Sequence, residues 1–393
     1  MHDLLAVDNP VRIGIIGGGQ LGKMLAQEAK RMSFNVIILD PTPDCPASVV
    51  SDRQIIADFK DESAIKKLAT ESDVITYEIE LGNSDILMHL ESEGHTVHPS
   101  AETLRTIQDK LQQKRVLRKN AIPVPDFEEI TSEKSLFEAL EKFGYPAVLK
   151  ARRDSYDGRG NFVINSKNDM PKALEFVRDR QCFLERFVRF TKEVSIMIAR
   201  NATGQIASFP LVENIHKDHV LYMTIAPARV SNAIKQKAKK IATKTMKTLK
   251  GSGIFGIEMF VTRNGDVLIN EIAPRPHNSG HYTIEACNVS QFEQHIRAIL
   301  DLPLLEPRLL SPAAMINILG EEDCEGTYAI KGIKEMMTIP GAKVHIYGKK
   351  ISKRGRKIGH ITVTDRTIAG AIAKARKARK MIKVLDSKVV KVG

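Results

Sequence analysis

The sequence lacks long apolar runs and closely spaced cysteines. None of its 393 residues belong to a run approaching the roughly 18 consecutive apolar residues of a membrane span, so we expect no transmembrane helix and no membrane partner. The four cysteines lie far apart without a C-x-x-C pair, which argues against a zinc site or a disulfide framework and favours buried thiols. The first ten residues hold two aspartates and no lysine or arginine, unlike a secretory signal, so we expect a cytoplasmic protein.

Positive charge is concentrated at the C-terminal end. The net charge is +12, and residues 331–393 contain 18 lysines and arginines against 3 aspartates and glutamates, so the first 330 residues carry about −3. Such a segment attracts nucleic acid or small anions such as nucleotides and sugar phosphates. Residues 374–383 contain no aromatic side chain for base stacking, so we expect a solvated helix face and no nucleic-acid partner. The alternative, a nucleic-acid-binding protein, predicts steeply salt-dependent binding to duplexes.

Length and composition indicate a globular protein of two or three domains, with 42% hydrophobic and 27% charged residues. Residues 1–108 alternate β-branched runs with amphipathic segments, which predicts an N-terminal open parallel sheet. The expected strands are 11–16, 36–39, 54–57, 73–77 and 96–97, and the expected helices are 21–32, 62–72 and 84–93.

The remaining chain divides into two further expected domains, 109–306 and 307–393. In the first, a helix over 109–119 precedes Ile122-Pro-Val-Pro125, where two prolines force extended backbone. An Asn264-Gly265 turn predicts a hairpin of strands 254–261 and 267–272. The basic last domain looks β-rich, with a final helix at 369–385. Further elements expected in the middle domain are strands 147–150, 162–164, 182–188 and 193–199 and a helix at 234–249.

Gly17-Gly-Gly19-Gln-Leu-Gly22 fits the G-x-G-x-x-G pattern between an expected strand and helix. Asp40 ends the next strand, 18 residues beyond Gly22, as in dinucleotide enzymes whose glycines admit a pyrophosphate to a helix N-terminus. The pattern also suits any tight strand-to-helix turn in an open sheet. An NAD-dependent dehydrogenase therefore stays open as an alternative.

Glu258 and Glu271 lie on the two strands of the expected hairpin, and Asn270 stands beside Glu271. Mg²⁺ prefers hard oxygen ligands and phosphate oxygens, so two carboxylates and an amide form a suitable set. We therefore expect Glu258 and Glu271 to bind magnesium. Solvated carboxylates on paired strands are the alternative.

The segment Asn270–His281 concentrates polar donors around two prolines, directly after an expected strand. Arg275, Asn278 and Ser279 suit charge-assisted hydrogen bonds to a phosphate. His277 and His281 lie four residues apart with no third strong ligand nearby, which argues against zinc.

Lys150 ends an expected strand and precedes a turn containing Asp157-Gly-Arg-Gly160. A lysine before a glycine-bearing turn can neutralise nucleotide phosphates while the loop closes over them. This order differs from a P-loop, where the lysine follows the glycines. The backbone of 185–188 could pair with an adenine edge, and Glu193 could accept hydrogen bonds from ribose hydroxyls.

Together these residues resemble the ATP-grasp fold. Within that superfamily, four stretches are similar to the N5-carboxyaminoimidazole ribonucleotide synthetase family, in matching order from about residue 11 to residue 365. The stretches are Gly17–Gly22, Ser155–Gly160, Asn270–His281 and Gly355–His360. The resemblance implies a mixed α/β and α+β protein: an ATP-grasp domain with an N-terminal parallel-sheet (pre-ATP-grasp) domain and a small β-rich C-terminal domain.

The resemblance also implies an activity. The protein would be an ATP-dependent carbon–nitrogen ligase of purine biosynthesis that joins bicarbonate to 5-aminoimidazole ribonucleotide through carboxyphosphate, giving ADP and phosphate. Mg²⁺ would be its cofactor and a homodimer its assembly. A sister ATP-grasp ligase, formate-dependent glycinamide ribonucleotide transformylase, is the nearest alternative and is favoured only by the Glu78-Ile-Glu80 triplet.

Roles for single residues follow from the same resemblance. The implied ATP contacts are Lys110, Lys150, Ser155, Tyr156, Asp157, Gly158, Arg159, Gly160, Asn161, Glu185, Arg186, Phe187, Val188, Glu193, His216, Asn270 and Glu271. The implied catalytic residues are Tyr156, Arg159, Arg275 and His277, and the implied magnesium ligands are Glu258 and Glu271. The implied ribonucleotide contacts are Gly19, Gln20, Leu21, Glu78, Asn278, Ser279, Lys349 and Arg356.

Overall fold

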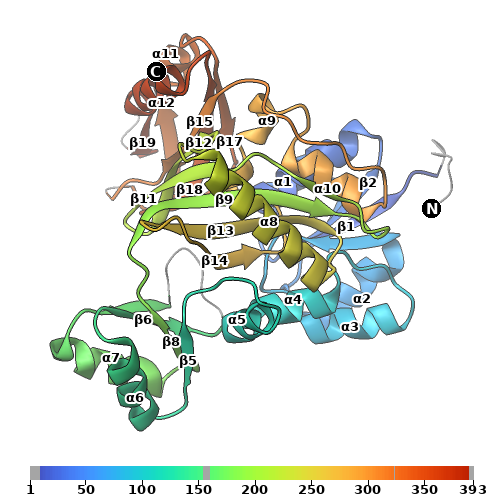
Figure 1. Ribbon diagram of the computed structural model, residues 1–393. Coiled ribbons are helices and arrows are strands. Elements are labelled where there is room, and N and C mark those ends of the chain that lie inside the picture. Colours follow the sequence, from blue (N-terminus) through green and yellow to red (C-terminus); the bar gives the residue numbers. More distant parts are fainter. Residues whose placement is uncertain (1–8, 154–159, 323, 389–393) are drawn as a thin grey trace.

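The computed structural model describes residues 9–153, 160–322 and 324–388. Figure 1 shows three larger β-sheets flanked by helices, and a two-stranded sheet lies near the C-terminus. Over the described ranges, no helix is both long and apolar enough to cross a lipid bilayer. All four cysteines are buried free thiols, as predicted.

The first sheet is parallel and carries the glycine motif at the end of its first strand. Its order is β3-β2-β1-β4, from β1 (Arg12–Ile16), β2 (Asn35–Leu39), β3 (Arg53–Ile55) and β4 (Val74–Tyr77). Helices α1 (Gln20–Arg31), α2 (Glu62–Glu71) and α3 (Ser84–Ser92) accompany these strands, with a 3₁₀ turn at Ser48–Val50. The strands β1, β2 and β4 are buried on both faces, which explains their continuous apolar sequences. The predicted N-terminal parallel sheet is confirmed.

Polar caps fix where the next helices begin. Ser100 accepts a hydrogen bond at the start of α4 (Ala101–Gln108), and Asp109 accepts from two N–H groups at the start of α5 (Lys110–Lys119). Asp109 also lies 2.5 Å from an Arg152 nitrogen. This ion pair ties the N-terminus of α5, and with it Lys110, to the end of the strand that carries Lys150.

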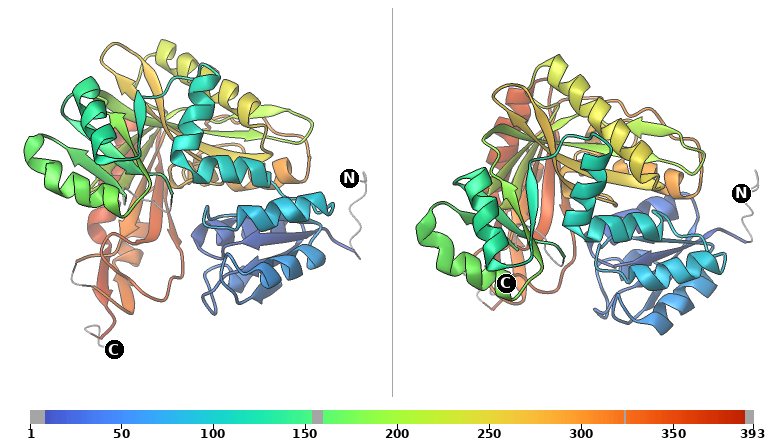
Figure 2. Two further views of the ribbon diagram at one scale, coloured as in Figure 1. Left: turned by 90° about the horizontal axis from the view of Figure 1, so that it is seen from below. Right: turned by 60° about the horizontal axis from the view of Figure 1, so that its bottom comes forward.

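A second, antiparallel four-stranded sheet has the order β5-β8-β6-β7. Its strands are β5 (Phe127–Ile130), β6 (Ala147–Ala151), β7 (Asn161–Ile164) and β8 (Cys182–Arg186). Helices α6 (Glu133–Phe143) and α7 (Met170–Arg178) and the 3₁₀ turn Lys167–Asp169 complete the unit. In Figures 1 and 2 this green unit stands to one side of the long central sheet. Its apolar core with α6 and α7 includes Leu149 and Leu184, so Lys150 and Glu185 project from the other face.

The central sheet has nine strands in the order β14-β13-β9-β11-β12-β15-β18-β17, with β10 paired to β9. Its strands are β9 (Phe190–Arg200), β10 (Ile206–Ser208), β11 (Val212–Lys217), β12 (Val220–Ala226), β13 (Gly253–Thr262), β14 (Val267–Ala273), β15 (Ala313–Leu319), β17 (Ala342–Ile346) and β18 (Lys357–Thr364). Helix α8 (Asn232–Leu249) packs on one face against Ile196, Ile257 and Ile272. The predicted hairpin of 254–261 and 267–272 is confirmed as β13 and β14.

The β-rich C-terminal segment extends this same sheet, because Met223 of β12 pairs with Ile316 of β15. Helix α12 (Ile368–Met381) packs against that end of the sheet (Figure 1). We keep 1–108, 109–306 and 307–393 as proposed domain bounds along the chain. The second and third of these domains share the central sheet. The remaining elements are the 3₁₀ turn Asn278–Gly280, α9 (Thr283–Ala286), α10 (Gln291–Ile299), β16 (Tyr328–Lys331), α11 (Ile333–Met337) and β19 (Lys383–Asp386).

Two expected elements end earlier than predicted. The strand expected at 182–188 stops at Arg186, whose backbone N–H donates to Asp126 O at 2.8 Å. The helix expected at 369–385 stops at Met381, and Lys383–Asp386 pair with β16 instead. The alternation of exposed Lys383 with buried Val384 has the period of a strand, which explains the change.

Candidate active site

The β13–β14 hairpin places two acidic side chains opposite each other. Glu258 pairs with Glu271 in the antiparallel register, on the sheet face away from α8. Lys110 Nζ lies 3.2 Å from Glu271 Oε1. Burial alone would raise the pKa of Glu271, but Lys110, Lys150 and Arg275 together outweigh it and lower that pKa. Burial raises the pKa of Glu258 to about 7, with Glu271 and Glu193 adding repulsion against the attraction of His216.

The raised pKa of Glu258 shows that this carboxyl group is short of compensating positive charge. A divalent cation between Glu258 and Glu271 would supply that charge. Carboxylate oxygens are the hard donors that Mg²⁺ prefers, so the residues present fit the ion.

A basic cavity lies beside the hairpin, where the small sheet meets the central one. Lys150 Nζ, from the small sheet, lies 2.8 Å from Glu185 Oε1 and 3.2 Å from Asn270 Oδ1 of the central sheet. Several ammonium groups around one cavity suit the phosphates of a nucleotide. The cavity is lined by Lys110, Gln113, Lys114, Lys150, Asn161, Phe183, Asn270 and Glu271.

Lys114 is a cavity residue that the sequence did not single out. Its ammonium lies 2.9 Å from Glu185 Oε2 and donates to Ile269 O at 3.0 Å, and the side chain is 2% exposed. Burial lowers the pKa of Lys114 to about 8, although Glu185 opposes the shift. Helix α5 carries five lysines and arginines, and no sequence feature singles out Lys114 among them.

Arg275 connects the central sheet to the N-terminal sheet. Its guanidinium lies 3.0 Å from Glu80 Oε1, just beyond the end of β4. Two residues earlier, Glu78 Oε1 accepts a hydrogen bond from Gly19 N–H at 2.6 Å. Burial raises the pKa of Glu78 to about 7, although Gly19 N–H, Arg275 and Lys349 oppose the shift. The glycine loop, Arg275 and Lys349 therefore surround one half-buried carboxyl group.

The N–H groups of the glycine loop are bonded within the protein. Gly17 N–H donates to Leu39 O and Gly18 N–H donates to Asp40 Oδ2, both at 2.8 Å. The other oxygen of Asp40 accepts from Thr42 N–H, and Asp40 is 6% exposed. A dinucleotide pyrophosphate would need those N–H groups, and a ribose would need that carboxylate. This geometry argues against the dehydrogenase alternative.

Gly19, Gln20 and Leu21, the ribonucleotide contacts predicted from this loop, differ in which of their groups could reach a ligand. Gly19 N–H is held by Glu78, and the Leu21 side chain is buried in the N-terminal core. Gln20 instead begins α1 and lines a second cavity with Lys23 and residues 344–347.

Glu193 and His216 form a pair on neighbouring strands of the same sheet face. His216 Nδ1 lies 2.7 Å from Glu193 Oε2. Burial alone would lower the pKa of His216, but Glu193 outweighs it and raises that pKa. Because the charge of His216 also acts on Glu258, the pair borders the acidic hairpin.

The segment after β14 is fastened to the sheet by buried side chains. The amides of Asn278 and Asn317 bond each other at 2.6 and 3.1 Å. Ser279 Oγ lies 2.7 Å from Ser195 Oγ, and His277 Nε2 lies 3.4 Å from Glu258 Oε1. Asn278 and Ser279 were predicted to bind the ribonucleotide, but the bonds of their side chains hold the loop in place.

Other predicted residues are not brought to this junction. Arg186 forms an ion pair with Asp126, and Phe187 and Val188 follow the end of β8, so no strand edge exists at 187–188. Arg356 donates to Ile351 O within the C-terminal segment. Asn161, by contrast, lines the basic cavity, and Gly160 precedes it at the start of the described part after the loop. Ser155, Tyr156, Asp157, Gly158 and Arg159 lie outside the described residues.

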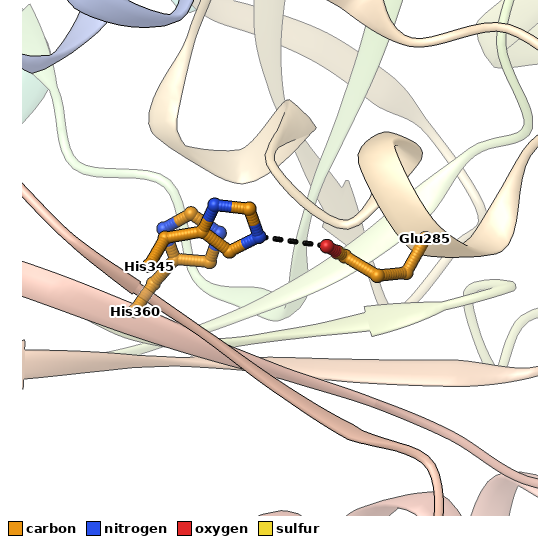
Figure 3. Close-up of side chains that lie close together, drawn as sticks. All are labelled: Glu285, His345 and His360. Carbon is orange, nitrogen blue, oxygen red and sulfur yellow. Dashed lines mark hydrogen bonds and ion pairs between the residues drawn. The ribbon is translucent and has the colours of Figure 1, made fainter. Parts of the chain in front are cut away.

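A further group of possible metal ligands lies away from the hairpin. Figure 3 shows Glu285 pointing at His345, with His360 beside it, and their ligand atoms lie within 4.8 Å of one another. His345 Nε2 already bonds Glu285 Oε1 at 2.7 Å, and the two imidazole rings are stacked at 7°. Nitrogen lone pairs lie in the ring plane, so stacked rings do not point at one ion. The group is a hydrogen-bonded stack as it stands.

Three family models match successive parts of the chain. They are described as the ribonucleotide synthetase preATP-grasp domain (residues 11–108), the ATP-grasp domain (115–292) and the phosphoribosylaminoimidazole carboxylase C-terminal domain (313–374). Their order confirms the predicted fold.

The chain is 43% identical over 351 residues to N5-carboxyaminoimidazole ribonucleotide synthase of Bacillus subtilis, covering 89% of this chain and 90% of that protein. The chain belongs to the N5-carboxyaminoimidazole ribonucleotide synthase family. It is also similar to the crystal structure of the family member from Thermotoga maritima, with 48% identity, a TM-score of 0.88 and coverage of 96% and 100% of the two chains.

Two further comparisons concern ligands and length. A family structure from Aspergillus clavatus in complex with ADP and 5-aminoimidazole ribonucleotide shares 37% identity and a TM-score of 0.87, covering 94% and 98% of the two chains. The phosphoribosylaminoimidazole carboxylase of Schizosaccharomyces pombe is 43% identical over 358 residues, which are 89% of this chain. The chain spans 64% of the length of that relative.

Proposed function

We propose that this chain is an ATP-dependent ligase that carboxylates 5-aminoimidazole ribonucleotide with bicarbonate, giving N5-carboxyaminoimidazole ribonucleotide, ADP and phosphate for purine biosynthesis. One observation carries the proposal. The Arg275–Glu80 ion pair brings the glycine loop and Glu78 of the N-terminal sheet beside the basic cavity and the acidic hairpin. A ribonucleotide site and a phosphoryl-transfer site then adjoin, as a reaction between two bound substrates requires.

The nucleotide would occupy the junction of the small and central sheets. Lys110 and Lys150 would neutralise its phosphates, since their ammonium groups line that cavity. Glu258 and Glu271 would hold Mg²⁺, which when bound neutralises charge on the transferring phosphoryl group. The predicted contacts from the loop 155–161, from 185–188 and from Glu193, His216 and Asn270 remain part of this proposal.

The chemistry proceeds in three steps. A bicarbonate oxygen attacks the γ-phosphorus of ATP, the bond to the β-phosphate oxygen breaks, and ADP leaves carboxyphosphate behind. Carboxyphosphate then loses phosphate to give carbon dioxide inside the closed site. The exocyclic amine forms a bond to that carbon and releases a proton. Because burial raises the pKa of Glu78 to about 7, that residue is suited to take up a proton near neutral pH.

Arg275 and Lys349 would bind the ribonucleotide or carboxyphosphate, because both charges act on the half-buried Glu78. Tyr156, Arg159 and His277 keep their proposed catalytic roles, and Gly19, Gln20, Leu21, Asn278, Ser279 and Arg356 their proposed place near the ribonucleotide. Residues 19–21, Asn278 and Ser279 would contact the ribonucleotide through backbone groups or through the shape of the surface that they form. We also propose that the protein is cytoplasmic and forms a homodimer. Light scattering of the purified protein would test the homodimer.

Oxygen-18 bicarbonate tests the proposed chemistry. With ATP, Mg²⁺ and 5-aminoimidazole ribonucleotide present, attack by a bicarbonate oxygen on phosphorus must carry the label into inorganic phosphate. Formate in place of bicarbonate should support no turnover, which separates this reaction from that of the formate-dependent sister ligase. Unlabelled phosphate formed together with carboxylated product would overturn the carboxyphosphate route.

A further inference from the structure

Three buried polar side chains form a row across the central sheet. Thr224 on β12, Asn214 on β11 and Ser195 on β9 are each at most 5% exposed. Asn214 pairs directly with Thr224, and Ser195 pairs with Glu258 of the acidic hairpin. Paired residues of antiparallel strands project to the same face, so the row lies on the face that carries the site.

Hydrogen bonds connect this row end to end. Thr224 Oγ1 donates to Asn214 Oδ1 at 3.1 Å, and Asn214 Nδ2 donates to Ser195 Oγ at 3.0 Å. Ser195 Oγ donates to Ser279 Oγ at 2.7 Å, and Ser279 Oγ lies 2.8 Å from His277 Nδ1. Each side chain in the row is therefore hydrogen-bonded to the next one, from Thr224 to His277.

The last contact has a definite direction. The backbone N–H of Ser279 also approaches His277 Nδ1, at 3.3 Å, and caps the short 3₁₀ turn. A backbone N–H can only donate, so Nδ1 must present its lone pair. The proton of a neutral His277 ring then lies on Nε2, which is 3.4 Å from Glu258 Oε1.

Burying these polar side chains gives the protein no stability advantage over apolar ones, which indicates that the row does more than fill space. A buried hydroxyl or amide gains little net stability even when it is bonded, and apolar side chains of similar shape would serve packing as well. On the opposite face, Val194 and Ile196 flank Ser195 along β9. That face also holds buried Glu213, which is ion-paired with Lys192 and Arg229, whereas the uncharged row lies on the face that ends at His277.

We propose that Thr224, Asn214, Ser195 and Ser279 form a positioning relay that fixes His277 as the Nε2–H tautomer and directs that N–H toward Glu258. The expected effect on turnover rests on the proposed function. The tautomer of His277 does not depend on it. In this proposal Ser195, Asn214 and Thr224 are positioning residues that act through His277. Ser279 thereby gains a role in place of a direct side-chain contact to the ribonucleotide.

The tautomer can be measured directly on the wild-type chain. Nitrogen-15 labelling of histidine and long-range proton–nitrogen correlation, at a pH well above the ordinary imidazole pKa of about 6.5, distinguishes Nε2–H from Nδ1–H. The His277 signal is assigned by its loss in a His277→Asn variant. We expect the Nε2–H form. The Nδ1–H form, or an even mixture of the two, would overturn the relay without any catalytic assay.

Variants then separate positioning from folding. Ser195→Ala removes the hydrogen bond that holds the Ser279 hydroxyl, so it should loosen the orientation of the His277 ring, shift its nitrogen-15 signals and lower kcat about tenfold, with the KM for ATP changed less than about twofold. Thr224→Val should act in the same direction more weakly, and Thr224→Ser, which keeps the hydroxyl, should restore the wild-type signal. Ser208→Ala is the matched control, because Ser208 is buried on the neighbouring β10 and its hydroxyl has no hydrogen-bond partner among the described residues.

The outcomes distinguish this inference from the proposed function. An unchanged His277 signal in Ser195→Ala, or an equal loss of kcat in Ser208→Ala, would contradict the relay. Absence of ribonucleotide-dependent turnover in the wild type would contradict the proposed function, while the tautomer measurement would still decide the relay.

Discussion

Replacing Glu258 with Gln should stabilise the ligand-free protein while removing a proposed metal ligand. Burial raises the pKa of Glu258 from an ordinary 4.5 to about 7. A carboxyl group whose pKa is raised in the folded state holds its proton there between those two values. Stability is therefore lost as the pH rises from 4.5 through 7, and the full cost is present above 7.

The magnitude follows from that shift. At 1.36 kcal/mol for each pKa unit, the shift corresponds to an upper limit of about 3 kcal/mol. The Glu258 side chain is 22% exposed, so water screens part of this cost and we expect about 1–2 kcal/mol. A neutral Gln carries none of it. The thermal midpoint should therefore rise by roughly 2–4 °C at about pH 8, and most of that gain should vanish at about pH 5.

Thermal unfolding with and without nucleotide provides the assay. Saturation at a hundredfold excess over the dissociation constant stabilises a folded protein by about 2.7 kcal/mol. The stabilisation by Mg²⁺ and ADP seen in wild type should be largely lost in Glu258→Gln, because one of two carboxylate ligands is gone. Destabilisation of the ligand-free variant at pH 8, or the same gain at both pH values, would refute the reasoning about this pair.

Three further substitutions test the other parts of the site. Glu271→Gln should abolish ATP turnover by removing the second carboxylate ligand, and full turnover in a steady-state assay would refute that assignment. Arg275→Ala should remove ribonucleotide-dependent turnover and leave ADP affinity largely intact by calorimetry; an equal loss of nucleotide affinity would show that Arg275 binds ATP. Lys114→Met leaves buried Glu185 with Lys150 as its remaining ion-pair partner, so denaturant unfolding should show a loss of about 3 kcal/mol. No loss would mean that Lys114 does not stabilise Glu185.

The sequence predicted the parts of the site that are local in the chain. The Asn264-Gly265 turn sets the β13–β14 register as far as Met259, and a bulge between Glu258 and Met259 then places Glu258 opposite Glu271. Arg275 follows four residues after Glu271, so it must lie near the same strand end. These relations depend on short chain segments, which sequence patterns describe well.

The parts that the sequence missed depend on distant pairing. The relay needs β9, β11 and β12 side by side, and Ser195 and Thr224 lie on strands whose order no local pattern gives. In the same way, the pairing of Met223 with Ile316 makes one sheet of segments that the sequence divides at residue 307. Lys114 was missed because its inward direction follows from how α5 packs on the small sheet. Composition and periodicity contain none of this information.

ADP release from ATP and Mg²⁺, measured with and without 5-aminoimidazole ribonucleotide and bicarbonate, tests the central claim most directly. The account predicts release that requires the ribonucleotide and rises with bicarbonate. Release that is indifferent to both, or none under any combination, would contradict the proposed carboxylation.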